Sequence, residues 1–193
     1  MGYTTDFIGH IDIDPPLNID EERYLLAFAR SRHFDREEGP YAVDANPAAA
    51  SSDGVPTERY NRSGPGQPGL WCGWEPCWDG CCISHDGMEK FYASVRWLEY
   101  LIDHFLRPGA VAADSPLPYF EGFTFDHRLD GIVAACRRDN KELYVIRVDD
   151  NKVCEEVLRP ADLRYVDFPP LPYEAAIDRE RERSRRRRRS AGR

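Results

Sequence analysis

The sequence predicts an α+β fold, in which an antiparallel sheet of about six or seven strands carries two main helices on one face. Three observations support this class. Segments rich in β-branched and aromatic residues fill most of residues 123–158, two other segments repeat apolar residues at helical spacing, and short turns rich in Asp, Asn and Gly separate the strands. Strands joined by such short turns pair with each other in antiparallel fashion.

The strands are expected in three places. Residues 2–14 alternate apolar and polar side chains until Pro15-Pro16 ends the run. Residues 70–76 and 81–86 form a hairpin whose turn contains Trp78-Asp79-Gly80, and Asp-Gly is a strong turn signal. A meander of three strands follows at residues 123–136, 142–148 and 152–158.

Two helices complete the predicted fold. The first covers residues 21–33, with Asp20 as its cap and acidic residues in its first turn. The second opens at Asp86-Gly87-Met88-Glu89, which has the spacing of a capping box. Its buried face repeats at intervals of three and four residues as Phe91, Val95, Leu98, Leu101, Ile102 and Phe105. Arg107-Pro108-Gly109 ends it.

The chain of 193 residues is divided into one domain and a tail. Residues 1–172 form a single α+β domain, and residues 45–68, which are rich in Ala, Ser, Gly and Pro, are expected to be a mobile loop within it. Residues 173–193 form a basic tail that we expect to be disordered or a frayed helix. The charge is divided in the same way: residues 179–193 hold nine arginines and two glutamates, whereas residues 1–178 hold 17 basic and 32 acidic residues, a net charge of −15.

Four sequence blocks appear in an order typical of one family. They are GYTTDF at the start, PPLN before the first helix, QPGLWC at 67–72, and DGMEKFYASVRWLEYLI at 86–102. In these blocks the chain resembles a family of uncharacterised small bacterial and phage-encoded proteins, over about residues 2–150. The resemblance implies no activity, cofactor or catalytic residue. Cys77, Cys81 and Cys82 stand where that family has polar or aliphatic residues, and the tail beyond 160 is an extension.

Four of the six cysteines lie between residues 72 and 82. With His85, the cysteines Cys72, Cys77 and Cys81 offer the ligand types of a zinc site. The C-x4-C-x3-C-C spacing lacks the paired C-x2-C turns of zinc knuckles, however, and adjacent residues of a strand point to opposite faces, which separates Cys81 from Cys82. We therefore expect reduced, packed thiols and no cofactor, with zinc as the less favoured alternative.

Candidate catalytic residues are few. Cys82, His85 and Asp86 lie just before the predicted second helix, where a thiol can be activated, and His127 could join them. An enzyme using this Cys/His/Asp set is one alternative function. Packed side chains without a catalytic role are the other interpretation, and we lean toward it because no spacing shows that these residues converge.

The tryptophans and the charge predict a different function. Trp71, Trp74 and Trp78 concentrate aromatic surface in the hairpin, and an exposed Trp is a common anchor of a binding surface. We expect a non-catalytic interaction protein that presents an acidic, Trp-bearing surface to a basic protein partner, a description that fits phage accessory or toxin-neutralising roles. Core packing of the same tryptophans is the competing interpretation.

The tail predicts a third possibility. Its arginine run can bind nucleic acid nonspecifically, or it can remain solvated or contact the acidic domain. The run consists of Arg185, Arg186, Arg187, Arg188 and Arg189. No apolar segment is long enough to span a membrane and no export signal precedes the domain, so we expect a cytoplasmic location and reduced thiols.

Overall fold

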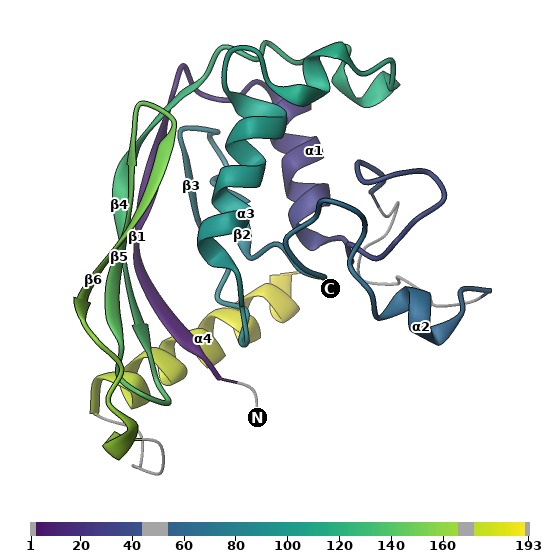
Figure 1. The fold of residues 1–193 in the computed structure, drawn as a ribbon. Coiled ribbons are helices and arrows are strands. Elements are labelled where there is room, and N and C mark those ends of the chain that lie inside the picture. Colours follow the sequence, from purple (N-terminus) through teal and green to yellow (C-terminus); the bar gives the residue numbers. More distant parts are fainter. Residues whose placement is uncertain (1–2, 44–53, 166–171, 192–193) are drawn as a thin grey trace.

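The fold was obtained as a computed structural model, which describes residues 3–43, 54–165 and 172–191. A six-stranded antiparallel sheet forms its body, with the strands in the order β2-β3-β1-β4-β5-β6 (Figure 1). The strands are β1 (Thr5–Asp14), β2 (Trp74–Pro76), β3 (Cys82–His85), β4 (Arg128–Arg137), β5 (Leu143–Asp149) and β6 (Lys152–Arg159). This confirms the predicted α+β class, the hairpin and the meander.

Two helices cover one face of the sheet, as predicted: α1 (Ile19–Arg30) and α3 (Ser94–Leu101) (Figure 1). The core between the sheet and these helices is strongly aromatic. Its largest fully buried side chains come from both layers and include Trp74, Trp97, Phe28, Phe105, Ile11 and Ile146. Alternation in β1 follows from this arrangement, because Ile11 and Ile13 face the core while Asp12 and Asp14 are exposed.

Helix α1 begins with a capping box, but its cap is Asn18 and not Asp20 as predicted. The Asn18 side chain accepts hydrogen bonds from the backbone N–H groups of Asp20 and Glu21, and the Glu21 carboxylate accepts one from the N–H of Asn18. Asp20 instead lies in the first turn, where its negative charge still favours the helix dipole.

The second predicted helix starts later than its sequence pattern indicates. Asp86 accepts from the N–H of Met88, which makes a turn and not a helix start, and α3 begins only at Ser94. The reason is Phe91, which is buried against Gly73, where a Cβ would lie 2.8 Å from its ring. Placing Phe91 in the core bends the chain between 87 and 93. From Ile102 to Leu106 the helix continues with π geometry.

The predicted mobile loop at 45–68 is only partly described. Residues 45–53 lie outside the described residues. Residues 54–68 contain the short helix α2 (Thr57–Tyr60) and contact the body: the Arg59 guanidinium donates to the carbonyl of Asp35, and the Gln67 amide donates to the carbonyl of Pro40. This part therefore wraps the domain, and its mobility stays a prediction.

The tail forms helix α4 (Pro172–Ala191), which crosses the end of the sheet where β1 begins (Figure 1). Its first half is held on the body by ion pairs. Lys141 Nζ lies 2.6 Å from Glu174 Oε1, and Asp6 receives both Arg138 at 2.8 Å and Arg181 at 3.3 Å. The sequence left contact with the acidic domain as one alternative for the arginine run, and the contacts in fact include Glu174 and Arg181, which precede that run. In the described residues, no helix combines the length and apolar character needed to cross a bilayer.

Candidate functional site

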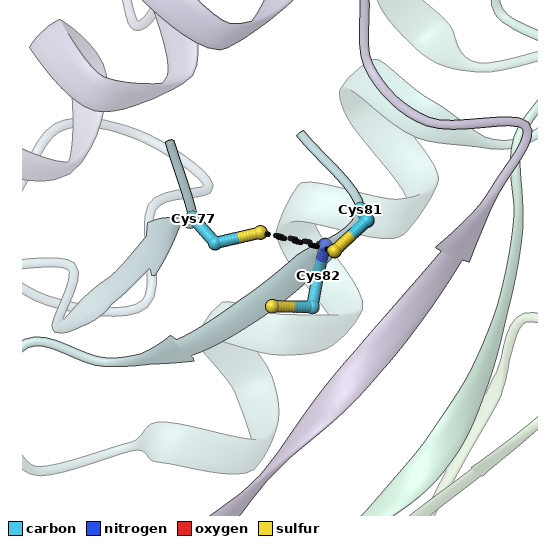
Figure 2. Close-up of side chains that lie close together, drawn as sticks. All are labelled: Cys77, Cys81 and Cys82. Atoms are coloured by element: carbon cyan, nitrogen blue, oxygen red, sulfur yellow. Dashed lines mark hydrogen bonds between the residues drawn. The ribbon is translucent and has the colours of Figure 1, made fainter. Parts of the chain in front are cut away.

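Three thiols converge at the turn between β2 and β3 (Figure 2). The sulfur atoms of Cys77, Cys81 and Cys82 all lie within 4.8 Å of one another, and the Cys77 and Cys81 sulfurs are 3.6 Å apart. The backbone N–H of Cys82 also donates to the Cys77 sulfur, at 2.9 Å. Cys81 is exposed, while the other two are half-buried, so the cluster is accessible from solvent.

This convergence contradicts the expected separation of Cys81 and Cys82. Alternation applies only inside a strand, and Cys81 belongs to the turn because β3 starts at Cys82. The turn is tight: the N–H of Gly80 donates to the carbonyl of Cys77, and the N–H of Cys77 donates to the carbonyl of Cys82. Sulfur atoms on both sides of the chain reversal can therefore meet.

Gly80 is required in this turn. Its φ is +70°, a region that strongly favours glycine, and a Cβ there would lie 2.7 Å from the carbonyl oxygen of Leu17. A hydrogen bond also joins these two residues, because the N–H of Leu17 donates to the carbonyl of Gly80. The N–H of Ile13 donates to the carbonyl of the next residue of the turn, Cys81. The turn is thus fixed against the segment that joins β1 to α1.

A carboxylate completes the cluster. Asp79 Oδ1 accepts a hydrogen bond from the Cys77 thiol at 3.0 Å, and thiol donors lower the pKa of Asp79. The nearby carboxylate and the second thiol raise the pKa of Cys81 to about 11, and burial is the main cause that raises the pKa of Cys82. Without a cation the Cys81 and Cys82 thiols therefore hold their protons near neutral pH, which makes them poor nucleophiles. From the sequence Asp79 is predicted only as a turn residue, although its position between Cys77 and Cys81 is the signal that could have indicated a ligand.

Two of the predicted metal ligands lie elsewhere. Cys72 is fully buried, its thiol faces the carbonyl of Trp74, and burial raises its pKa to about 12. His85 packs among core rings, with centroids 4.6 Å from Phe7 and 5.5 Å from Phe91. The structure thus replaces Cys72 and His85 by Cys82 and Asp79 in the candidate ligand set.

The structure does not join the candidate catalytic residues into one site. Cys82 belongs to the thiol cluster, whereas His85, three residues along β3, is buried in the core and has its pKa lowered to about 4, first by burial and then by the charge of Arg181. Its Nε2 is 3.6 Å from Asp86, beyond hydrogen-bond distance. His127 is buried against Glu21, near the end of β1. His85 instead contacts Phe7, near the start of β1.

The three hairpin tryptophans differ in exposure. Trp74 is only 1% exposed and its indole N–H donates to the carbonyl of Ser94, so the predicted binding role of Trp74 is wrong: it belongs to the core. Trp71 is 37% exposed and lies beneath the guanidinium of Arg32 at 5.3 Å. Trp78 is 87% exposed at the turn, beside the thiol cluster.

The arginine run lies in the second half of α4. Arg185 to Arg189 follow residues 173–181, whose contacts with the body include the Lys141–Glu174 and Asp6–Arg181 ion pairs. The helix therefore carries the run away from the buried ion pairs that hold its start.

Comparisons with protein-family models, with curated proteins and with solved structures found no match for this chain. The thiol turn, the exposed Trp78 and the docked helix are therefore interpreted from their own chemistry.

Proposed function

We propose that this is a non-catalytic binding protein that presents an acidic, Trp-bearing surface to a basic protein partner in the cytoplasm. The observation that carries the proposal is Trp78. An indole that is 87% exposed at the tip of a rigid turn loses little conformational entropy on binding and offers a large area to bury.

Acidic residues lie on the turn that carries this indole and on the strand beside it. Asp79 follows it directly, and the hydrogen bonds of Gly80 and Cys81 to Leu17 and Ile13 bring the turn beside the exposed Asp12 and Asp14 of β1. We call Trp78, Asp79, Asp12 and Asp14 the hairpin-tip surface. The hairpin-tip surface is negatively charged, like residues 1–178 as a whole, which have a net charge of −15. Complementary charge accelerates association with a basic partner. A toxin-neutralising or phage accessory role fits this chemistry.

The test compares the full chain with two single variants, Trp78→Ala and Leu163→Ala. Leu163 is 78% exposed on the 3-10 turn after β6, so its replacement removes a similarly exposed apolar side chain from another surface. Proteins retained from the host lysate by each immobilised variant are quantified at low and high salt. We expect a basic protein that the wild type and Leu163→Ala retain, and that Trp78→Ala loses.

The retained protein is then purified and titrated while the Trp emission is followed. Loss of a central Trp anchor should weaken binding by about 2 kcal/mol or more, roughly 30-fold. Replacing Asp12 and Asp14 by Asn should slow association and reduce its dependence on salt. Equal affinity of the wild type and Trp78→Ala, or binding that salt does not affect, would contradict the proposal.

A second candidate function rests on α4, because five consecutive arginines, Arg185 to Arg189, lie in the second half of this helix. Binding of nucleic acid through this run would be nonspecific and would weaken steeply with salt. A chain shortened after Arg183 keeps the Arg181–Asp6 ion pair and removes the run. Retention of the full chain on DNA, lost in the shortened chain, would support this candidate; equal behaviour of both would reject it.

A further inference from the structure

The thiol cluster has the dimensions of a metal site. Sulfur atoms bound to one tetrahedral zinc at about 2.3 Å lie about 3.8 Å from each other. The Cys77 and Cys81 sulfurs are 3.6 Å apart, and Cys82 completes a triangle with no edge longer than 4.8 Å. Only small side-chain rotations separate this triangle from three corners of a coordination tetrahedron.

Asp79 can supply a fourth ligand after its side chain rotates, because its carboxylate lies on the same turn but is not within 4.8 Å of all three sulfur atoms. Asp79 Oδ1 lies 3.0 Å from the Cys77 sulfur and 3.5 Å from the N–H of Cys81, on the same turn. Carboxylate oxygen and thiolate sulfur are both established zinc ligands. The backbone needs little rearrangement, because Gly80 and its contact with Leu17 fix the turn.

We propose that Cys77, Cys81, Cys82 and Asp79 bind one zinc ion. Binding would release the protons of the three thiols to solvent and would place a four-ligand site on the turn that also carries Trp78. This inference does not depend on the proposed partner, and its test uses none, so either proposal can fail while the other stands.

The test uses the full chain, reduced and freed of metal with a chelator, and cobalt(II) as a spectroscopic probe for zinc. We expect the intense visible bands of tetrahedral cobalt and sulfur-to-cobalt charge transfer in the ultraviolet, both saturating at one equivalent and both removed by zinc. Cys81→Ser should lose one sulfur's share of the charge transfer. Its zinc affinity should fall by more than the roughly 10–100-fold that loss of an outer-shell partner costs.

Two matched variants control this experiment. Cys154→Ser removes an exposed thiol on β6 and should bind cobalt as the wild type does. Asp79→Asn should keep the charge transfer of three sulfurs but bind more weakly. A spectrum that does not saturate at one equivalent, or an equal loss in Cys81→Ser and Cys154→Ser, would overturn the proposal.

Protection from alkylation gives a second measurement that needs no variant. Zinc should slow the alkylation of Cys77, Cys81 and Cys82, mapped by mass spectrometry of peptides, and leave Cys154 as reactive as before. Alkylation of the cluster that zinc does not slow would overturn the proposal. So would isolation of Cys77 and Cys81 as a disulfide that persists under reducing conditions, because that bond removes two of the ligands.

Discussion

Glu21 and His127 form an ion pair in the interior, with the carboxylate 3.1 Å from Nε2 and both side chains only 1% exposed. The other ring nitrogen of His127 lies 2.7 Å from the carbonyl of Pro15, so both nitrogens face acceptors, as a protonated imidazole requires. Burial opposes charge on both groups, but their mutual hydrogen bond outweighs it. The pKa of His127 is raised by Glu21 and the Pro15 carbonyl. The pKa of Glu21 is lowered by His127 and by the N–H donors of Thr124 and Asn18.

This pair joins the start of α1 to the start of β4, and its loss should destabilise the whole domain. In Glu21→Gln the buried imidazole loses its counter-charge, a change that costs about 3–5 kcal/mol for a buried pair. Urea unfolding followed by circular dichroism measures it. Glu22→Gln, the same change at the next and less buried position of α1, is the control and should cost much less. Equal costs for the two variants would contradict the role of the pair.

His85 should make the protein sensitive to acid. Its folded pKa is lowered to about 4 from 6.5, mainly by burial, so between these values the unfolded chain binds a proton that the folded chain does not. Stability therefore falls as the pH drops below about 6.5, by about 1.4 kcal/mol per pH unit for this group. His33, with a pKa lowered to about 3, acts in the same direction.

The measurement is the urea midpoint between pH 4 and 7 for the wild type and for His85→Phe. Phenylalanine suits the ring cluster of Phe7 and Phe91 and cannot titrate. We expect a shallower fall in stability with acid in His85→Phe. An unchanged slope would mean that other groups cause the acid sensitivity.

The tryptophans of the hairpin should separate stability from binding. Trp74→Ala empties a fully buried site and should cost about 3–5 kcal/mol. Trp78→Ala removes a side chain that makes no contribution to the core, and its urea midpoint should equal that of the wild type. A large destabilisation by Trp78→Ala would show that this indole packs against the body in solution, and would also weaken its assignment as a binding anchor.

Docking of α4 should depend on the buried pair of Lys141 and Glu174, whose side chains are 3% and 1% exposed. Glu174→Gln leaves the Lys141 ammonium without its counter-charge, so we expect faster hydrogen exchange throughout α4 while the central strands stay protected. Glu180→Gln changes an exposed carboxylate of the same helix and should have no effect on exchange. Unchanged exchange in Glu174→Gln would show that other contacts suffice to hold α4.

Much of the fold could be predicted because it depends on local pattern. The period of two in residues 2–14 and the Asp-Gly turn at 79–80 predict strands and a hairpin whatever surrounds them. The start of α3 could not be predicted in this way. Its capping-box pattern at Asp86 is sound in isolation, but Phe91 is buried against Gly73, and this burial stabilises the molecule more than the seven helical residues at 87–93 would.

The candidate site was also predicted only in part from the sequence. The sequence showed that the cysteines cluster and that hairpin tryptophans are numerous, but it assigned Cys81 to a strand and expected it to point away from Cys82. The strand begins one residue later, at Cys82, and the alternation of side chains does not extend to Cys81 in the turn. Sequence alone also could not pair Glu21 with His127, since their contact depends on how β1, α1 and β4 are packed.

The sequence by itself determined the α+β class, the hairpin and meander, the acidic body and the basic end of the chain, because composition and short-range periodicity act locally. Only the tertiary structure decided which Trp is exposed, which thiols meet, and that the basic helix begins by docking on Asp6, Arg138 and Lys141. These are properties of contacts between segments distant in the chain, and the burial that creates those contacts exists only once the sheet and its helices have assembled.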